Sequence, residues 1–324
     1  MGFVSWVTTA FAAGQLEQGL VYGFAAMGVF LTFRILNFAD LTVDSSFTTG
    51  AGTTAVLISH GVNPWVATLC GFCAGALAGL ITALLHTKLH IDPLLASIIT
   101  MVGLWSVNLR IMGGSRIGLI NEDTIFTPLR KLGPLTKSYW PVLVLVLFAL
   151  IIIWVTNWLL STNLGLAVQA TGDNPTMASA LGVSTDTTKI LTLMYSNGLV
   201  GLSGAVLAQL NNSSDISMGV GQIVAGLAGV IIGNAIFGTR FMFLAVLGAM
   251  GGSVLYHLVV YWALYLPFFG PNDMKLISAV IVVLALVISQ SKKLRALFAR
   301  ISPMRQKHDA PEPMLEVPGK EEEA

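Results

Sequence analysis

Long apolar segments separated by short polar connectors constrain this chain more than any other feature. A helix needs about 20 mostly apolar residues to cross the hydrocarbon core of a bilayer. Only 10% of the 324 residues are charged and 55% are hydrophobic, whereas a soluble domain carries about 25% charged residues. The pattern predicts an all-α polytopic membrane helix bundle of about nine transmembrane helices. The expected spans are 15–33, 40–58, 64–85, 93–112, 139–160, 188–210, 218–237, 241–266 and 273–290.

These spans form one expected transmembrane domain, 15–290, between two terminal segments. Residues 1–14 lack the basic start of a signal peptide, and we expect a short interfacial segment there. Residues 291–324 begin with six Lys and Arg side chains and then turn acidic and Pro-rich. Because the acidic part has too little apolar surface to bury, we expect a disordered tail.

The distribution of Lys and Arg predicts the topology. The basic cluster after the last span places the C-terminus in the cytoplasm. Counting back through nine spans places the N-terminus outside, and Arg34, 86–92, 161–187 and Arg240 inside. Residues 113–138 then lie outside although four Lys and Arg face only two acidic residues there, which opposes the rule.

Several classes of function are excluded or disfavoured. The net charge of +1, with scattered basic residues, argues against a nucleic-acid partner. Cys70 and Cys73 form a C-x-x-C in an apolar run, which is better explained by packing than by redox or metal chemistry. His86 and His90 lack a third metal ligand. No nucleophile, base and orienting group stand at a catalytic spacing, so we expect no enzyme and no metal site.

Glycines recur at four-residue spacing in three of the apolar segments. This spacing lets the backbones of neighbouring membrane helices approach closely. It predicts a tightly packed bundle and does not indicate a function. The repeats are Gly71, Gly75 and Gly79; Gly229 and Gly233; and Gly248 and Gly252.

The connector 161–187 is unusually long for a bundle of this kind. Asp173 or Asn174 can cap a helix that begins at Pro175. Met177, Ala178 and Leu181 would form its apolar face, with Gly182 as its stop, and a second helix would begin near Ser184 or Thr185. Such a short amphipathic helix can sit in the groove of a partner protein or rest on lipid headgroups. The spacing alone leaves both open.

Two sequence elements carry a resemblance to a known family. Residues 169–182 resemble the cytoplasmic coupling loop of ABC importer permeases of the branched-chain amino acid and ribose type. Residues 36–39, Leu-Asn-Phe-Ala, followed by Gly50 and Ala51, are similar to the start of the second helix in those permeases. With LRIMGG and TIF further on, the chain is most similar to the tryptophan/tyrosine-type subfamily. Asp40 and Leu41 replace the usual His-Gly, so the identity of the solute does not carry over.

The resemblance implies a transport subunit that works with other proteins in the bacterial inner membrane. The sequence contains no G-x-x-x-x-G-K-[ST] loop, so ATP and Mg would be bound by a cytoplasmic ABC ATPase dimer. The implied partners also include a second permease copy, forming a homodimer, and an extracytoplasmic solute-binding protein or lipoprotein. The solute would be a small organic molecule, an aromatic or branched-chain amino acid. The residues expected to couple to the ATPase are Gly172, Asp173, Pro175, Met177, Ala178, Leu181 and Gly182.

Polar side chains within the spans are candidates for the solute path. A charge at mid-bilayer costs about 2.5–3.5 kcal/mol on insertion scales and normally faces a cavity or the bundle interior. Residues 37, 40, 44 and 48 would share one helix face. The candidates are Asn37, Asp40, Asp44, Ser45, Thr48, Asn197 and Gln222.

Other roles for these residues remain open. Asp40 can act as an N-cap at the membrane interface, and Asp44 can pair with an Arg or Lys. Asn197 and Gln222 can simply hydrogen-bond a neighbouring helix. A rival function is a proton- or sodium-coupled secondary transporter that uses Asp44 in a broken second helix, although no inverted repeat is evident. A membrane scaffold without transport is disfavoured by the buried Asp44.

Overall fold

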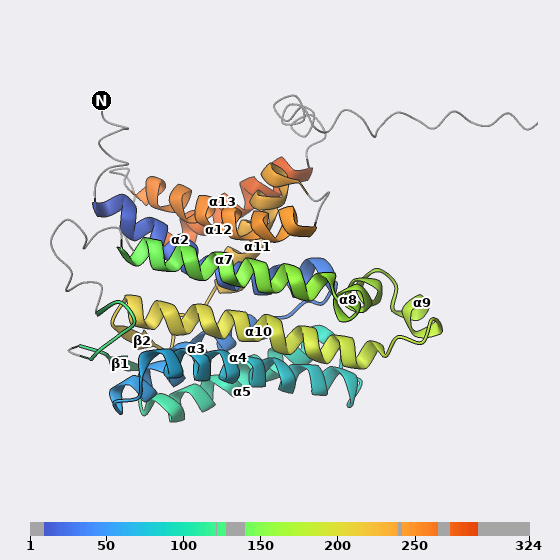
Figure 1. Ribbon diagram of the computed structural model, residues 1–324, viewed down its shortest axis with the longest axis horizontal. Coiled ribbons are helices and arrows are strands. Elements are labelled where there is room, and N and C mark those ends of the chain that lie inside the picture. Colours follow the sequence, from blue (N-terminus) through green and yellow to red (C-terminus); the bar gives the residue numbers. More distant parts are fainter. Residues whose placement is uncertain (1–9, 121, 128–139, 239–241, 265–272, 291–324) are drawn as a thin grey trace, which may run out of the picture.

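The computed structural model describes residues 10–120, 122–127, 140–238, 242–264 and 273–290 (Figure 1). Most of the expected N-terminal segment and all of the expected tail lie outside these residues, so both stay predictions. The helices are α2 (Ala10–Val29), the π-helix η1 (Phe30–Ile35), α3 (Thr42–Ser59), α4 (Pro64–Thr87), α5 (Pro93–Met112), α7 (Trp140–Ser161), α8 (Asn163–Asp173), α9 (Pro175–Ala180), α10 (Thr185–Leu210), α11 (Gln222–Phe237), α12 (Met242–Leu264) and α13 (Met274–Gln290). Two short strands, β1 (Arg116–Gly118) and β2 (Ser213–Asp215), complete the described elements.

Local capping explains why two of these helices begin where the sequence predicts. The side chain of Asn63 accepts a hydrogen bond from the Trp65 N–H at 2.9 Å, ahead of a proline at the first position of α4. The side chain of Asp92 accepts from the Leu94 N–H at 3.0 Å, ahead of the proline that begins α5. Such a capping side chain satisfies one free N–H of the first turn, and proline at the first position has no N–H to satisfy.

Helix α10 runs through the centre of the bundle. It packs against α3 and α4 on one side and against α2 on the other, with α5 beyond α3 and with α11, α12 and α13 beyond α2 (Figure 1). Most of the α10 side chains are buried. The core therefore lies around α10, and the outer faces of α4, α5 and α7 carry exposed apolar side chains suited to lipid.

The predicted close packing of the glycine repeats is confirmed. A Cβ atom at Gly75 would overlap the Asn197 carbonyl oxygen of α10, and one at Gly79 would overlap the Leu193 carbonyl oxygen. Between α11 and α12, a Cβ at Gly233 would overlap the Gly248 carbonyl oxygen. These glycines let helix backbones touch directly.

The polytopic helical bundle is confirmed, whereas the count of nine spans is not. Six helices among the described residues are long and apolar enough to cross a membrane: Gly14–Ile35, Pro64–Thr87, Pro93–Met112, Pro141–Ser161, Thr185–Leu210 and Met242–Ala263. The second expected span is a continuous helix, α3, and not a broken one. The seventh is short, because residues 216–221 are not helical and α11 begins only at Gln222.

The two ends of the bundle differ. Helices α8 and α9 project at one end, and the β1–β2 ribbon lies at the opposite end (Figure 1). The strands are antiparallel, with Arg116 opposite Asp215. The Leu119 N–H donates to the Asn212 carbonyl at 2.8 Å and extends the ribbon. The described part of 113–138 therefore lies at the end away from α9, as the topology prediction requires.

Candidate functional site

After the ribbon, residues 216–221 return into the bundle alongside α3. The Thr48 hydroxyl donates to the Ile216 carbonyl at 3.5 Å and accepts from the Gly219 N–H at 3.2 Å. A Cβ at Gly219 would overlap the Asp44 carbonyl oxygen, so this segment lies directly on the α3 backbone. Non-helical backbone at membrane depth is tolerated where protein surrounds it and satisfies its polar groups.

The Asp44 carboxylate holds the start of α11. One oxygen accepts from the Gly221 N–H at 3.0 Å and the other from the Ile223 N–H at 2.9 Å. The α11 N-terminus lies about midway along the length of the bundle, because Ser46, on the same turn of α3 as Asp44, bonds to Asn197 midway along α10. Val220 and Gly221, which precede α11, are exposed at the surface of the bundle. Asp44 is thus a cap of a distant helix, and its described bonds go to backbone N–H groups, not to the Arg or Lys considered above.

A pocket of about 340 Å³ lies beside Asp44, between α3, α5 and the returning segment. Three of the predicted path residues, Asp44, Ser45 and Thr48, line it together. The rest of the wall is mostly apolar or aromatic and comprises Met101, Val102, Trp105, Ser106, Asn108, Ile216 and Val220. A mostly apolar cavity with a few polar groups is the usual form of a small-molecule site.

Asn108 is a wall residue that the sequence reasoning missed. It is 2% exposed, and its amide nitrogen donates to the Ser45 carbonyl at 3.3 Å. Its side-chain oxygen is buried and finds no hydrogen-bond partner among the described residues. A buried acceptor without a partner costs about 1–3 kcal/mol. The sequence signal that could have identified Asn108 is its polar amide within the otherwise largely apolar span 93–112.

Asp40 and Asn197 lie in a separate buried network. One Asp40 oxygen accepts from the Thr42 N–H at 2.9 Å, and the other accepts from the Asn197 side chain at 2.6 Å. Asn197 in turn accepts from the Ser46 hydroxyl at 2.7 Å. Both Asp40 and Asn197 are fully buried, and neither lines the pocket. In this structure they tie the start of α3 to α10.

Asn37 and Gln222 also lie away from the pocket wall. The Asn37 side chain donates to the Gly172 carbonyl in α8 at 2.9 Å. Gln222 begins α11, and its amide donates to the Met218 carbonyl at 3.1 Å within the returning segment. The structure therefore brings three of the seven predicted path residues to the pocket and places the other four in contacts between elements.

The helix predicted within the connector 161–187 is present as α9. Asn174 caps it, accepting from the Met177 N–H at 3.0 Å, while Asp173 is the last residue of α8. At its end the Gly182 N–H donates to the Ser179 carbonyl and the Val183 N–H to the Ala178 carbonyl, both at 3.0 Å. Gly182 has a φ of +85°, so this is a Schellman motif that requires glycine.

The apolar residues of α9 do not share one face. Ala178 is 2% exposed and packs inward, whereas Met177 is 61% and Leu181 is 72% exposed. The expectation of a single apolar face over all three residues is therefore corrected: burial of Ala178 anchors the helix, and Met177 and Leu181 form the exposed pair. Two large apolar side chains on a short projecting helix suit contact with another protein.

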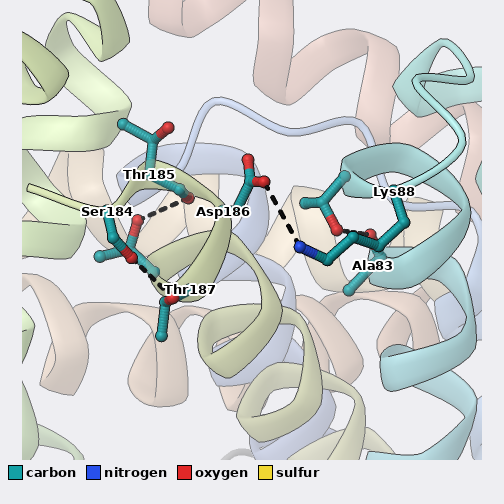
Figure 2. Close-up of polar contacts among 8 residues, drawn as sticks. Ala83, Lys88, Ser184, Thr185, Asp186 and Thr187 are labelled. Atoms are coloured by element: carbon teal, nitrogen blue, oxygen red, sulfur yellow. Dashed lines mark hydrogen bonds and ion pairs between the residues drawn. The ribbon is translucent and has the colours of Figure 1, made fainter.

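The base of this projection is held by neighbouring elements. A Cβ at Gly172 would overlap the Ile35 carbonyl oxygen, so α8 lies directly on η1. The Thr171 hydroxyl bonds to the Thr188 hydroxyl of α10 at 3.0 Å. Lys88, which follows α4, pairs with Asp186 in the first turn of α10 at 3.9 Å and so links these two helices (Figure 2). The projecting helix is therefore attached to several elements of the bundle.

Comparison with known proteins agrees with this geometry. Residues 11–288 match the family described as "Branched-chain amino acid transport system / permease component". The chain is 38% identical over 269 residues to the "Tyrosine transport system permease protein" of Clostridioides difficile, covering 83% of this chain and 88% of that protein. It is 28% identical over 255 residues to the "Galactofuranose transporter permease protein YtfT" of Escherichia coli, covering 78% and 72%.

A solved structure, "PsaBC from Streptococcus pneumoniae in complex with Fab", is similar in fold. The TM-score is 0.54 at 14% identity, and the alignment covers 92% of this chain and 99% of that one. At this identity the likeness concerns the fold alone. A relative of 33% identity, "Uncharacterized protein RP368" of Rickettsia prowazekii, covers 68% of this chain and 76% of that protein.

Proposed function

Because this chain belongs to the permease family of branched-chain amino acid transport systems, we propose that it carries an amino acid through the membrane as one subunit of an ATP-driven importer. The observation that carries the proposal is α9, with Met177 and Leu181 exposed on a helix anchored to the bundle. A groove in a cytoplasmic ATPase dimer is the partner that such a helix fits. ATP and Mg would be bound and used by that dimer.

The pocket beside Asp44 is the proposed solute path. Its mixed wall suits an apolar or aromatic amino acid, since Trp105, Met101 and Val102 offer apolar surface. Asn108 lines the pocket, and its side-chain oxygen, which is buried and unpartnered among the described residues, would accept a hydrogen bond from the solute after the amide turns toward the pocket. The tyrosine permease of Clostridioides difficile supports an amino acid as the solute class, and an aromatic one first.

The remaining partners follow from the two ends of the bundle. With α9 in the cytoplasm, the β1–β2 ribbon lies outside, where a solute-binding protein or lipoprotein would dock. The exposed apolar face of α5, which includes Ile99, Val102 and Trp105, borders the pocket and would meet a second copy of the chain in a homodimer. The alternation of successive helices supports a cytoplasmic C-terminus in this multi-pass plasma-membrane protein, since the end of α13 would then lie on the α9 side.

The test is reconstitution of the permease with its ATPase and binding protein in liposomes. We expect uptake of L-tyrosine that requires ATP on the side of the membrane where the ATPase is bound. The double variant Met177→Glu/Leu181→Glu should lose ATPase binding, because two charges replace the exposed apolar pair. The control, Ile120→Glu, changes a residue that is 79% exposed at the ribbon end and should retain binding.

Two results would contradict the proposal, and a third would change only the solute. Undiminished ATPase binding by the double variant would remove the coupling role of α9. Uptake by the permease alone under a proton or sodium gradient would indicate a secondary transporter. Uptake of other amino acids but not tyrosine would correct the solute within the same function.

A further inference from the structure

Asn37 does not line the pocket, and it occupies a distinctive position at the base of α8. Its backbone φ is +51°, in the left-handed region that asparagine tolerates better than most residues. The Asn37 side-chain amide donates a hydrogen bond to the Gly172 carbonyl at 2.9 Å, although the two residues are 135 positions apart in the sequence. Next to this bond, Gly172 lies directly on the carbonyl group of Ile35. The connector after η1 is therefore fixed to α8 by both a hydrogen bond and backbone contact.

We propose that Asn37 is a positioning residue, and that the Asn37–Gly172 contact is the joint through which movement of α9 reaches the pocket wall. The proposal rests on the proposed coupling of α9 to an ATPase. It adds a second mechanical route from the α8–α9 unit to α3, beside the one through α10, which packs against both. Coupling of this kind is carried by rigid elements and packed contacts that move together.

The first part of the route is the α8–α9 unit. Asn174 belongs to both helices: its N–H donates to the Ala170 carbonyl at 3.0 Å to end α8, and its side chain caps α9. A single residue thus joins the two helices and leaves no flexible linker. A displacement of α9 would therefore carry Gly172, at the end of α8, with it.

The second part of the route is the connector between η1 and α3. The Leu36 N–H donates to the Leu31 carbonyl at 3.0 Å and the Phe38 N–H to the Thr32 carbonyl at 2.9 Å, so the connector is hydrogen-bonded to η1. At its far end Asp40 accepts from the Thr42 N–H. Short π-helical segments often occur at functional sites. The connector is hydrogen-bonded at both ends and can transmit a displacement instead of absorbing it.

The last part of the route is α3 itself. The helix begins at Thr42, and within its first two turns Asp44, Ser45 and Thr48 line the pocket. Asp44 also holds the start of α11. A shift of the connector would therefore reach the pocket wall and the returning segment together.

The test compares Asn37→Asp with Asn212→Asp in the full complex of permease, ATPase and binding protein. Aspartate keeps the size of asparagine and its tolerance of positive φ, but its carboxylate cannot donate to Gly172. Asn212 is a matched control, because it also has positive φ, at +50°, and lies beside the ribbon at the other end of the bundle. Hydrogen exchange is measured on permease alone and on the complex with nucleotide.

We expect complex formation to slow exchange at 174–183 in the wild type and in both variants. Exchange at 36–44 should change about fivefold in the wild type and in Asn212→Asp, and not in Asn37→Asp. The ratio of L-tyrosine imported to ATP hydrolysed should fall about fivefold in Asn37→Asp alone. Fivefold is the factor that one ordinary hydrogen bond contributes to an equilibrium.

Failure of this proposal and failure of the proposed function give different results. If Asn37→Asp keeps the wild-type response at 36–44 and the wild-type transport ratio, the joint is wrong while the function stands. If the wild type itself shows no protection at 174–183 with the ATPase, coupling through α9 is wrong. A purely structural role of Asn37 would alter exchange at 36–44 in the free permease and leave the transport ratio unchanged, which also overturns the proposal.

Discussion

Replacing Asp44 should destabilise the whole bundle, because its carboxylate caps α11 from within another helix. Both oxygens accept backbone N–H groups, at 3.0 and 2.9 Å. Hydrogen bonds to a charged group contribute about 1.5–3 kcal/mol each, and loss of a helix cap costs about 0.5–2 kcal/mol. Asp44→Ala removes both acceptors, so we expect a loss of about 3 kcal/mol in the free energy of unfolding. Asp44→Asn keeps one acceptor, so we expect a loss of about half that.

The assay is unfolding of the purified permease in mixed micelles, followed by circular dichroism as the fraction of denaturing detergent rises. The matched control is Asp215→Asn. Asp215 also accepts two bonds, from the N–H and hydroxyl of Ser217 at 2.8 and 2.6 Å, but in an exposed position. Water replaces those bonds, so the control should lose less than about 1 kcal/mol. Equal stability of Asp44→Ala and the control would refute the capping role of the Asp44 carboxylate.

Three further predictions test packing and charge elsewhere. Gly204→Ala should cost about 1–3 kcal/mol of unfolding free energy, because the added Cβ would overlap the α3 backbone. Gly103→Ala is the control, since a Cβ there has open space, and it should be near neutral in the same assay. Similar losses in the two variants would contradict the packing argument. The serine bonds, followed by the positive charge of Arg116, lower the pKa of Asp215. The carboxylate therefore stabilises the ribbon above its ordinary pKa of about 3.9, and this contribution is lost as the pH falls below it. The protection of ribbon amides, taken relative to their intrinsic exchange rate at each pH, should fall below about pH 4 in the wild type, and unchanged protection there would contradict this. Lys88→Ala should cost less than about 1 kcal/mol, since the ion pair with Asp186 is largely exposed, and a larger loss would show a stronger pair.

Helix boundaries were the most predictable part of this fold. The expected span 93–112 coincides with α5, and the start of α4 at Pro64 was also correct. Both signals are local, because a capping side chain and a proline act within one turn. The cap and stop of α9 were predictable for the same reason. Apolar length predicted the bundle correctly but not the number of spans, since the expected spans 40–58, 218–237 and 273–290 are not among the six candidate spans of the described residues. Residues 216–221 return into the bundle without forming a helix, which apolar composition does not reveal.

Roles that depend on contacts between distant segments could not be predicted. The helical spacing of residues 37, 40, 44 and 48 implied one shared face, but α3 begins only at Thr42. Asn37 and Asp40 therefore precede the helix and point to other partners, Gly172 and Asn197. Those partners lie more than 130 positions away, and no local pattern encodes such pairing. The polarity of these side chains within an apolar segment marked them as candidates. Only the fold shows that Asn37 and Asp40 contact other elements whereas Asp44 and Thr48 line the pocket.

The position of Asp44 bears on the rival mechanism. A carboxylate at membrane depth costs several kilocalories per mole unless it is compensated. Here two backbone N–H groups and the positive end of the α11 dipole provide that compensation. A carboxylate committed in this way is a poor site for a driving ion, because binding the ion would compete with the cap of α11. The unpartnered oxygen of Asn108 lacks any such commitment among the described residues. Under the proposed function, the charged group of the pocket therefore holds the wall in place, which fits transport driven by ATP hydrolysis on a partner subunit better than transport driven by an ion bound at Asp44.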